Sequence, residues 1–255
     1  MGLLLALLAC SSVERWPISG RVLVVQRDAV VLDHDPIPGF MDAMVMTLEA
    51  PDVARLPLEP GHRIEATLVV DGDRSRLEDI TLLSVSRQRA PIVAVTPPLA
   101  LGEAIAPRTV PLSDGTTTTL GPGLPTALTF LFTTCPLPEY CPLLATKLAA
   151  LQSRIRGHGR ILAITLDPAT DTPAVLQAYS ARVGADPTVW QFGRLEPAAL
   201  AALLDAAGVV RFAGEAGIRH ALRLLVLDAE GRLVRVESSN RWDVETVAAA
   251  LSGED

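Results

Sequence analysis

The spacing of hydrophobic and polar residues changes character near the middle of the chain. Up to residue 86, short segments rich in Val, Ile and Leu alternate with turn residues such as Asp71-Gly72-Asp73. Runs of β-branched residues between turns are typical of strands. Because an open sheet of this size would leave exposed edges, we expect a small, all-β, five-stranded barrel of OB-like form. Its predicted strands cover residues 21–25, 30–32, 45–48, 64–70 and 80–83.

The second half of the chain alternates strand and helix patterns. The apolar run from 127 to 133 predicts a strand that is covered on both faces. Leu144, Leu148 and Leu151 then mark one face of a helix. Further strands are predicted at 161–166, 189–192, 222–227 and 233–237, and further helices at 173–183, 197–207 and 243–251. This order is typical of an α/β thioredoxin-like domain.

A proline-rich segment separates the two patterns. Residues 90–102 carry three prolines and no helical period, which is typical of an extended linker. The sequence therefore predicts four parts, which are a signal peptide at 1–10, a barrel at 17–86, a linker at 87–101 and a thioredoxin-like domain at 102–253.

Composition argues against one class of partner. The 255 residues are 49% hydrophobic, which is enough for a substantial core and leaves room for two domains. The formal net charge is -7, and Lys and Arg form no cluster. Nucleic acid is therefore not expected as a partner.

The N-terminus predicts export and a lipid anchor. An apolar run from Met1 to Ala9 ends in a small residue just before Cys10, as in a bacterial lipoprotein signal that leaves lipid on that cysteine. The run is too short to span a bilayer, which takes about twenty apolar residues. We expect a monomer that faces the periplasm and is lipid-anchored to the cell membrane or the outer membrane, with no other membrane contact.

The two remaining cysteines carry the strongest chemical signal. Cys135 and Cys141 lie on a turn between a predicted strand and a predicted helix, where the helix N-terminus favours thiolate over thiol. Such a pair can bind a soft metal ion, exchange between dithiol and disulfide, or form a structural disulfide. Because an exported compartment is oxidising, a pair kept reduced there needs a periplasmic thiol reductant as partner.

Three short motifs follow one another in this half of the chain. They are Thr133-Thr134-Cys135-Pro136 with Cys141-Pro142, the stretch from Asp167-Pro168 to Asp171-Thr172-Pro173, and His220 just ahead of a predicted strand. With these motifs, residues 102–251 resemble the Sco/SenC family of copper-handling thioredoxin-like proteins. The resemblance implies Cys135, Cys141 and His220 as ligands of Cu(I) or Cu(II), a donor set that suits both oxidation states. Five residues separate the cysteines here, where the family usually has three.

Other polar residues have simpler interpretations. Asp167 and Asp171 could hold a hard metal ion, but beside Pro173 they fit a loop and a helix cap better. His62 and His158 are expected at the surface.

Methionines cluster in the first half. Met41, Met44 and Met46 lie within six residues, downstream of His34. Clustered methionines usually fill a core, yet thioethers and an imidazole also suit Cu(I). Residues 19–84 resemble the periplasmic CusF-type copper and silver carriers, which implies His34, Met44 and Met46 as copper ligands. Met41 stands where that family has a tryptophan, so an aromatic cap is expected to be missing and Met41 to act as a third thioether.

These signals lead to one hypothesis and two alternatives. The hypothesis is a metallochaperone that passes copper to a copper-accepting protein, by family analogy the dinuclear copper centre of an oxidase subunit. The first alternative is a thiol–disulfide oxidoreductase in which Cys135 and Cys141 are the catalytic redox pair. Cys141 is expected to be the more acidic thiol, although solvent access could make Cys135 the attacking one. The second is a copper- or silver-sequestering resistance protein.

Overall fold

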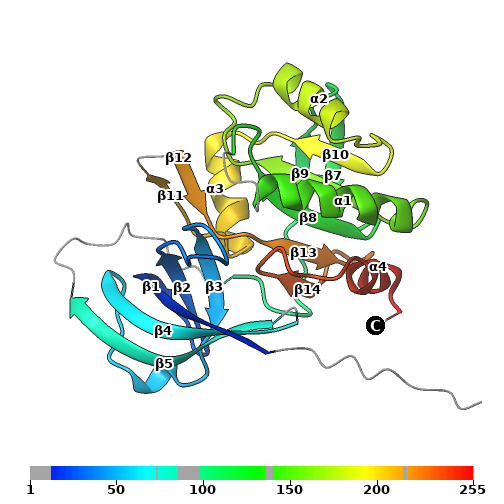
Figure 1. Cartoon of the computed structure of the whole chain (residues 1–255). Coiled ribbons are helices and arrows are strands. Elements are labelled where there is room, and N and C mark those ends of the chain that lie inside the picture. Colours follow the sequence, from blue (N-terminus) through cyan, green and yellow to red (C-terminus); the bar gives the residue numbers. More distant parts are fainter. Residues whose placement is uncertain (1–12, 73, 86–97, 136–139, 215–216, 255) are drawn as a thin grey trace, which may run out of the picture.

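The computed structural model describes residues 13–72, 74–85, 98–135, 140–214 and 217–254. Within them the chain forms an all-β unit and an α/β unit that lie against each other (Figure 1). The predicted signal peptide with Cys10 and most of the predicted linker lie outside the described residues.

The all-β unit contains the five strands that the sequence predicts. They close into a barrel in the order β1-β2-β3-β5-β4, in which β1 pairs with both β2 and β4. All pairs are antiparallel except β3 with β5. The barrel interior is filled by fully buried side chains, which include Leu32, Leu48 and Leu68. The elements are β1 (Glu14–Val25), β2 (Ala29–His34), β3 (Val45–Glu49), a 3-10 turn (Val53–Arg55), β4 (His62–Asp71) and β5 (Arg74–Val85).

The α/β unit is built on a five-stranded sheet in the order β10-β9-β8-β13-β14. Strands β8 (Thr126–Leu131), β9 (Arg160–Thr165) and β10 (Trp190–Gly193) are parallel. Strands β13 (Leu224–Leu227) and β14 (Leu233–Glu237) run antiparallel at the other edge. Strands β8 and β9 are buried along their whole length, as expected of strands covered on both faces.

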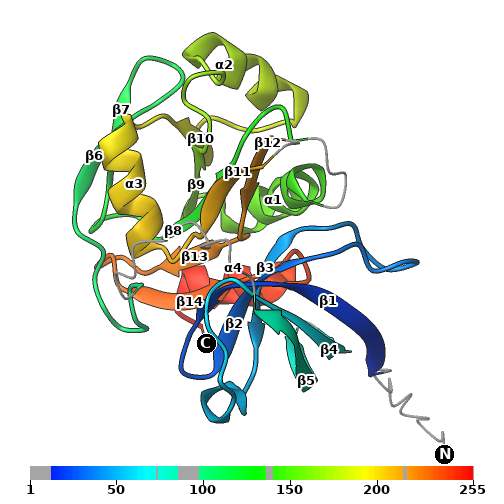
Figure 2. The ribbon, with the colours of Figure 1, turned by 90° about the vertical axis from the view of Figure 1, so that its left-hand side faces the viewer.

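Helices cover both faces of this sheet. Helix α1 (Cys141–Ile155) and helix α4 (Val244–Ser252) contact each other on one face. Helix α3 (Pro197–Ala206) lies on the opposite face (Figure 2). Helix α2 (Pro173–Arg182) packs beside β10. Every predicted helix is present, and none of those described is both long and apolar enough to cross a membrane.

Two hairpins were not predicted from the sequence. One pairs β6 (Arg108–Pro111) with β7 (Thr117–Leu120), and the other pairs β11 (Arg211–Gly214) with β12 (Gly217–His220). Strand β7 is a run of threonines, and the second hairpin contains two glycines, so neither has the apolar alternation that marks a strand. The second hairpin matters for the site because β12 ends at His220.

The barrel and the α/β unit are joined by direct contacts. Val45 of β3 forms a parallel bridge with Ala221, just after β12. Leu23 and Val31 of the barrel pack there against Val210 of the α/β unit in one buried cluster. Strand β3, which follows the methionines, therefore lies next to the strand that carries His220.

Candidate functional site

Strand β8 delivers the first cysteine, and helix α1 begins with the second. After β8 the chain turns at Phe132, whose carbonyl accepts a hydrogen bond from the N–H of Cys135 at 3.4 Å. Cys135 is half-buried, and the Cys141 side chain is buried against the core. Both sulfurs are thiols in this structure, so it does not contain the structural disulfide that the sequence left open.

Asp171 fixes the backbone just before Cys135 through hydrogen bonds. Its buried carboxylate accepts hydrogen bonds from the N–H of Thr133 at 3.1 Å and from the hydroxyls of Thr133 and Thr165 at 2.5 Å. Thr172 caps α2 by accepting a hydrogen bond from the N–H of Val175. The prediction that this motif forms a loop and a helix cap is confirmed.

The electrostatics of Cys141 differ from the prediction. Its pKa lies well above the ordinary value for a thiol, because it shares a hydrogen bond with Cys135, is buried, and lies near the negative charge that Cys135 would carry. The expectation that the helix N-terminus favours the thiolate form of Cys141 is therefore wrong. Burial and the neighbouring sulfur outweigh the helix dipole, whose effect is typically about 0.3–1 kcal/mol.

His220 is buried between two aromatic rings. The rings of Tyr140 and Phe132 meet the imidazole edge-on, with centroid distances of 5.0 and 5.9 Å. The Nδ1 atom lies 3.1 Å from the carbonyl oxygen of Ala221, so in the neutral ring Nδ1 carries the proton. Burial lowers the pKa of His220 to about 4. Atom Nε2 is buried and has no hydrogen-bond partner among the described residues, which leaves its lone pair available.

The three ligands implied for the α/β unit are linked through Phe132, but they do not form a preassembled metal site. Phe132 lies beside His220, and its backbone forms a hydrogen bond with Cys141. Among the residues that the structure describes, however, no three His, Cys, Asp or Glu side chains lie close enough together to hold a metal ion. Residues 136–139, between the cysteines, are not among them. The set Cys135, Cys141 and His220 therefore stays a proposal.

The barrel presents a second imidazole in a similar state. His34, at the end of β2, is buried, and its Nδ1 donates to the carbonyl of Asp35 at 2.7 Å. Burial lowers the pKa of His34, although its hydrogen bond with Asp35 opposes the shift. Its Nε2 also has no hydrogen-bond partner within the described part of the chain. Both predicted histidine ligands are thus neutral rings with an available nitrogen.

The three methionines occupy different positions. Met46 is buried in the barrel core, Met41 packs at the edge of that core, and Met44 packs against the cores of both units. The burial of Met46 is typical of a methionine that packs in a core. Met44 is a cross-strand neighbour of His34, whose N–H donates to the carbonyl of Met44 at 3.0 Å.

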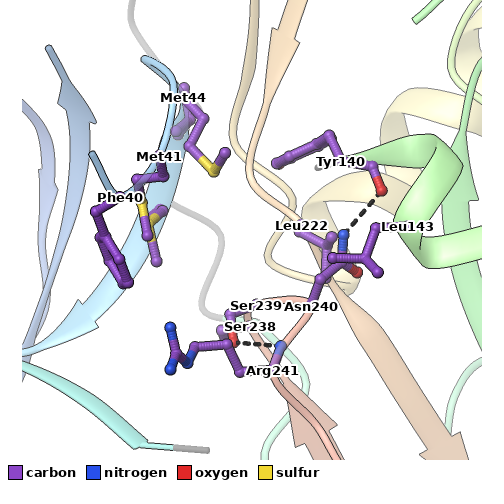
Figure 3. Close-up of a pocket in the computed structure, with 12 residues that line it drawn as sticks. Phe40, Met41, Met44, Tyr140, Leu143, Leu222, Ser238, Ser239, Asn240 and Arg241 are labelled. Carbon is purple, nitrogen blue, oxygen red and sulfur yellow. Dashed lines mark hydrogen bonds between the residues drawn. The ribbon is translucent and has the colours of Figure 1, made fainter. Parts of the chain in front are cut away.

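A cavity of about 260 Å³ lies between the two units (Figure 3). All three methionines line it from the barrel side, and Tyr140, Leu143 and Asn240 line it from the other. The side chain of Asn240 donates to the carbonyl of Tyr140 at 2.8 Å, which fixes the residue before Cys141. The three methionines and Tyr140, the residue before Cys141, therefore face one cavity.

Sequence reasoning missed two aromatic residues and misplaced one histidine. Tyr140 and Phe40 both line the cavity, so aromatic rings are present near the methionines after all. Their positions directly before Cys141 and Met41 were the available signal. His158 is exposed, as predicted. The prediction that His62 lies at the surface is wrong, because its ring is buried and accepts a hydrogen bond from the N–H of Glu59 at 3.1 Å.

Solved structures of low sequence identity share the α/β fold. Arabidopsis thaliana ScoI with copper bound is 23% identical over 61% of this chain and 98% of its own, with a TM-score of 0.51. A SCO1/SenC family lipoprotein from Bacillus anthracis is 18% identical over 60% and 95%, with a TM-score of 0.54. BsSco, described as having a disulfide switch and as a member of the Sco family of cytochrome c oxidase assembly proteins, is 19% identical over 63% and 98%, with a TM-score of 0.50. These likenesses establish the thioredoxin-like Sco fold.

A search of curated proteins found no match. The SCO1/SenC family model, however, matches residues 116–254, which is more than half of the chain and includes Cys135, Cys141 and His220. The chain belongs to the SCO1/SenC family.

Proposed function

We propose that this protein is a copper chaperone whose α/β unit carries copper at Cys135, Cys141 and His220. The observation that carries the proposal is that one unit holds both a pair of hydrogen-bonded thiols and a buried imidazole with an available Nε2. Thiolates are the preferred ligands of Cu(I), and an added imidazole also suits Cu(II). A relative with the same fold, ScoI of Arabidopsis thaliana, was solved with copper bound.

Copper is the cargo of this protein, and the protonation states of the ligand residues determine what must change when it binds. Cys141 must lose the proton that its environment holds tightly, so binding releases at least that proton. His220 needs no deprotonation, because its ring is already neutral near pH 7. Since the three ligands are not preassembled, copper binding has to draw the cysteine turn toward His220.

The barrel supplies the second part of the proposal. We propose that it is a CusF-like, OB-like copper-binding module that uses His34, Met44 and Met46, with Met41 as a further thioether. The closed five-stranded sheet and the cross-strand pairing of His34 with Met44 support this assignment. A thioether site binds Cu(I) less tightly than a thiolate site, so the ion would move downhill to the cysteines.

The recipient and the location are proposed by analogy with relatives. BsSco is described as a member of a family of cytochrome c oxidase assembly proteins, and a Bacillus anthracis relative is a lipoprotein. We propose that this chain is lipidated at Cys10, faces the periplasm as a monomer, and delivers copper to the dinuclear copper centre of an oxidase.

Anaerobic calorimetric titration with Cu(I) tests this function. The wild-type chain is expected to bind copper at two sites of different affinity, and the Cys135→Ser/Cys141→Ser double variant is expected to lose the tighter one. His220→Ala should weaken that site, whereas His158→Ala, a matched control at an exposed histidine, should not. Unchanged stoichiometry in the double variant would remove the proposed carrier site.

One observation favours thiol–disulfide exchange as a second candidate function. Cys135 is half-buried while Cys141 is buried beneath it, which is the arrangement of an attacking thiol and a resolving thiol. In that reaction the two thiols would become a disulfide and pass two electrons and two protons to a disulfide of the copper acceptor. A reduction potential that periplasmic donors cannot reach would exclude turnover.

A further inference from the structure

Three side chains with soft donor atoms lie in neighbouring positions where the two units meet. His34 ends β2, Met44 immediately precedes β3, and His220 ends β12. His34 is the cross-strand neighbour of Met44. On the other side of Met44, the parallel bridge from Val45 to Ala221 makes the preceding residues, Met44 and His220, neighbours as well. The order across the strands is therefore His34, Met44, His220.

These three side chains share one face of the strands. Val31, Val45 and Ala221 pack together in the buried cluster between the units. Because successive side chains of a strand point to opposite faces, Met44 and His220 point away from that cluster, and so does His34, three residues after Val31. Met44 accordingly packs against the cores of both units.

The spacing of the strands places Met44 between the two histidines. Adjacent strands lie about 4.8 Å apart, so the backbones of His34 and His220 are separated by roughly 10 Å. The flexible thioether of Met44 lies between them, and its sulfur is directed into the cavity toward Tyr140 (Figure 3).

An ion pair holds this row together. The guanidinium of Arg219 lies 2.6 Å from the carboxylate of Asp33, with both side chains mostly buried. These residues are the sequence neighbours of His220 and His34. The contact therefore fixes the two histidine-bearing strands relative to each other at the same position as the row of donors.

We propose that Met44 is a relay that hands Cu(I) from the barrel donors to His220 and the cysteines within one docked molecule. This inference rests on the function proposed above. The copper–sulfur bond to Met44 persists while the bonds to His34 and Met46 are replaced by bonds to His220 Nε2 and the cysteine sulfurs. The bond to Met44 breaks last, which leaves copper on two sulfurs and one nitrogen. Copper stays in the +1 state throughout, and the thiol protons leave to water.

Rapid mixing of the full chain with a weak Cu(I) donor complex tests the relay. The absorbance of the thiolate–Cu(I) bond reports arrival at the cysteines. The wild type should show a first-order phase whose rate does not depend on protein concentration, because the transfer is intramolecular. Met44→Leu, which keeps the volume and removes the sulfur, should slow that phase by at least about tenfold and leave its final amplitude unchanged.

The control is Leu143→Ala, which alters the cavity wall without touching a donor and should keep the wild-type rate. An equal rate in Met44→Leu, or a wild-type rate that grows with protein concentration, would overturn the relay while leaving the carrier site intact. Lost amplitude in Met44→Leu would also overturn it, since Met44 would then be a permanent ligand. Absence of the absorbance in the wild type would overturn the proposed function itself.

Discussion

The hydroxyl of Tyr140 donates a hydrogen bond to the backbone carbonyl of His220, eighty residues away in the sequence. The ring of Tyr140 also lies edge-on to the His220 imidazole, with an interplanar angle of 82°. Because Tyr140 immediately precedes Cys141, this contact ties the cysteine turn to the histidine strand. It is a direct physical link between the two parts of the proposed copper site.

Removing the Tyr140 hydroxyl is expected to affect both stability and copper binding. Tyr140→Phe keeps the ring but leaves a buried carbonyl without its donor, which should lower the free energy of unfolding by about 1–3 kcal/mol. Copper affinity should fall as well, since His220 is held less firmly. Denaturant unfolding and Cu(I) competition measure the two effects. Tyr179→Phe, whose ring contacts Phe192, is the matched control, and an equal loss of copper affinity in it would contradict the assignment.

Stability should fall in mild acid because His220 is buried as a neutral ring. Its pKa is about 4 in the folded chain and 6.5 in the unfolded chain. Between these values the unfolded state binds more protons, so the free energy of unfolding decreases as the pH is lowered through this window, by roughly 3 kcal/mol in all.

The His220→Gln variant isolates this contribution. It should show a shallower dependence of unfolding free energy on pH between about 6.5 and 4 than the wild type, since His34 titrates in both. Identical slopes, measured by urea unfolding at a series of pH values, would show that His220 does not carry the effect.

Copper affinity should rise with pH, because the Cys141 thiol is protonated in the apo chain. Its raised pKa means that each bound copper displaces that proton, so affinity should increase about tenfold per pH unit for each proton released. Competition titrations between about pH 6 and pH 8, with proton release measured in buffers of different ionisation enthalpy, check this. An affinity that is constant over this range would mean that no thiol proton is displaced.

The sequence predicted the elements well and the contacts between them poorly. Strand β8 is recognisable as a continuous apolar run, because both faces of the sheet are covered. Helix α1 is recognisable by the spacing of its leucines, because one face of the helix packs against the sheet. The hairpin that positions His220 has no comparable apolar pattern. The position of this hairpin beside Val45 depends on the docking of the two units. The pKa of Cys141 was misjudged because its hydrogen bond with Cys135 and its burial outweigh the effect of the helix N-terminus.

Asp171 should act as a support for the cysteine turn and not as a metal ligand. Asp171→Asn replaces one carboxylate oxygen, an acceptor, with an amide donor and leaves at least one threonine partner unsatisfied. We expect a loss of about 1–3 kcal/mol in the free energy of unfolding and weaker Cu(I) binding through a disordered turn. Asp167→Asn, at the more exposed end of the same loop, is the control. Comparable effects from the two variants would argue against this role.

X-ray absorption at the copper edge, on the full chain loaded with one equivalent of Cu(I), tests the central claim most directly. The account predicts two sulfur neighbours and one nitrogen neighbour around the ion, with the nitrogen lost in His220→Ala and the thiolate sulfurs lost in Cys135→Ser/Cys141→Ser. A nitrogen shell that persists in His220→Ala, or a spectrum that does not change in the double variant, would contradict it.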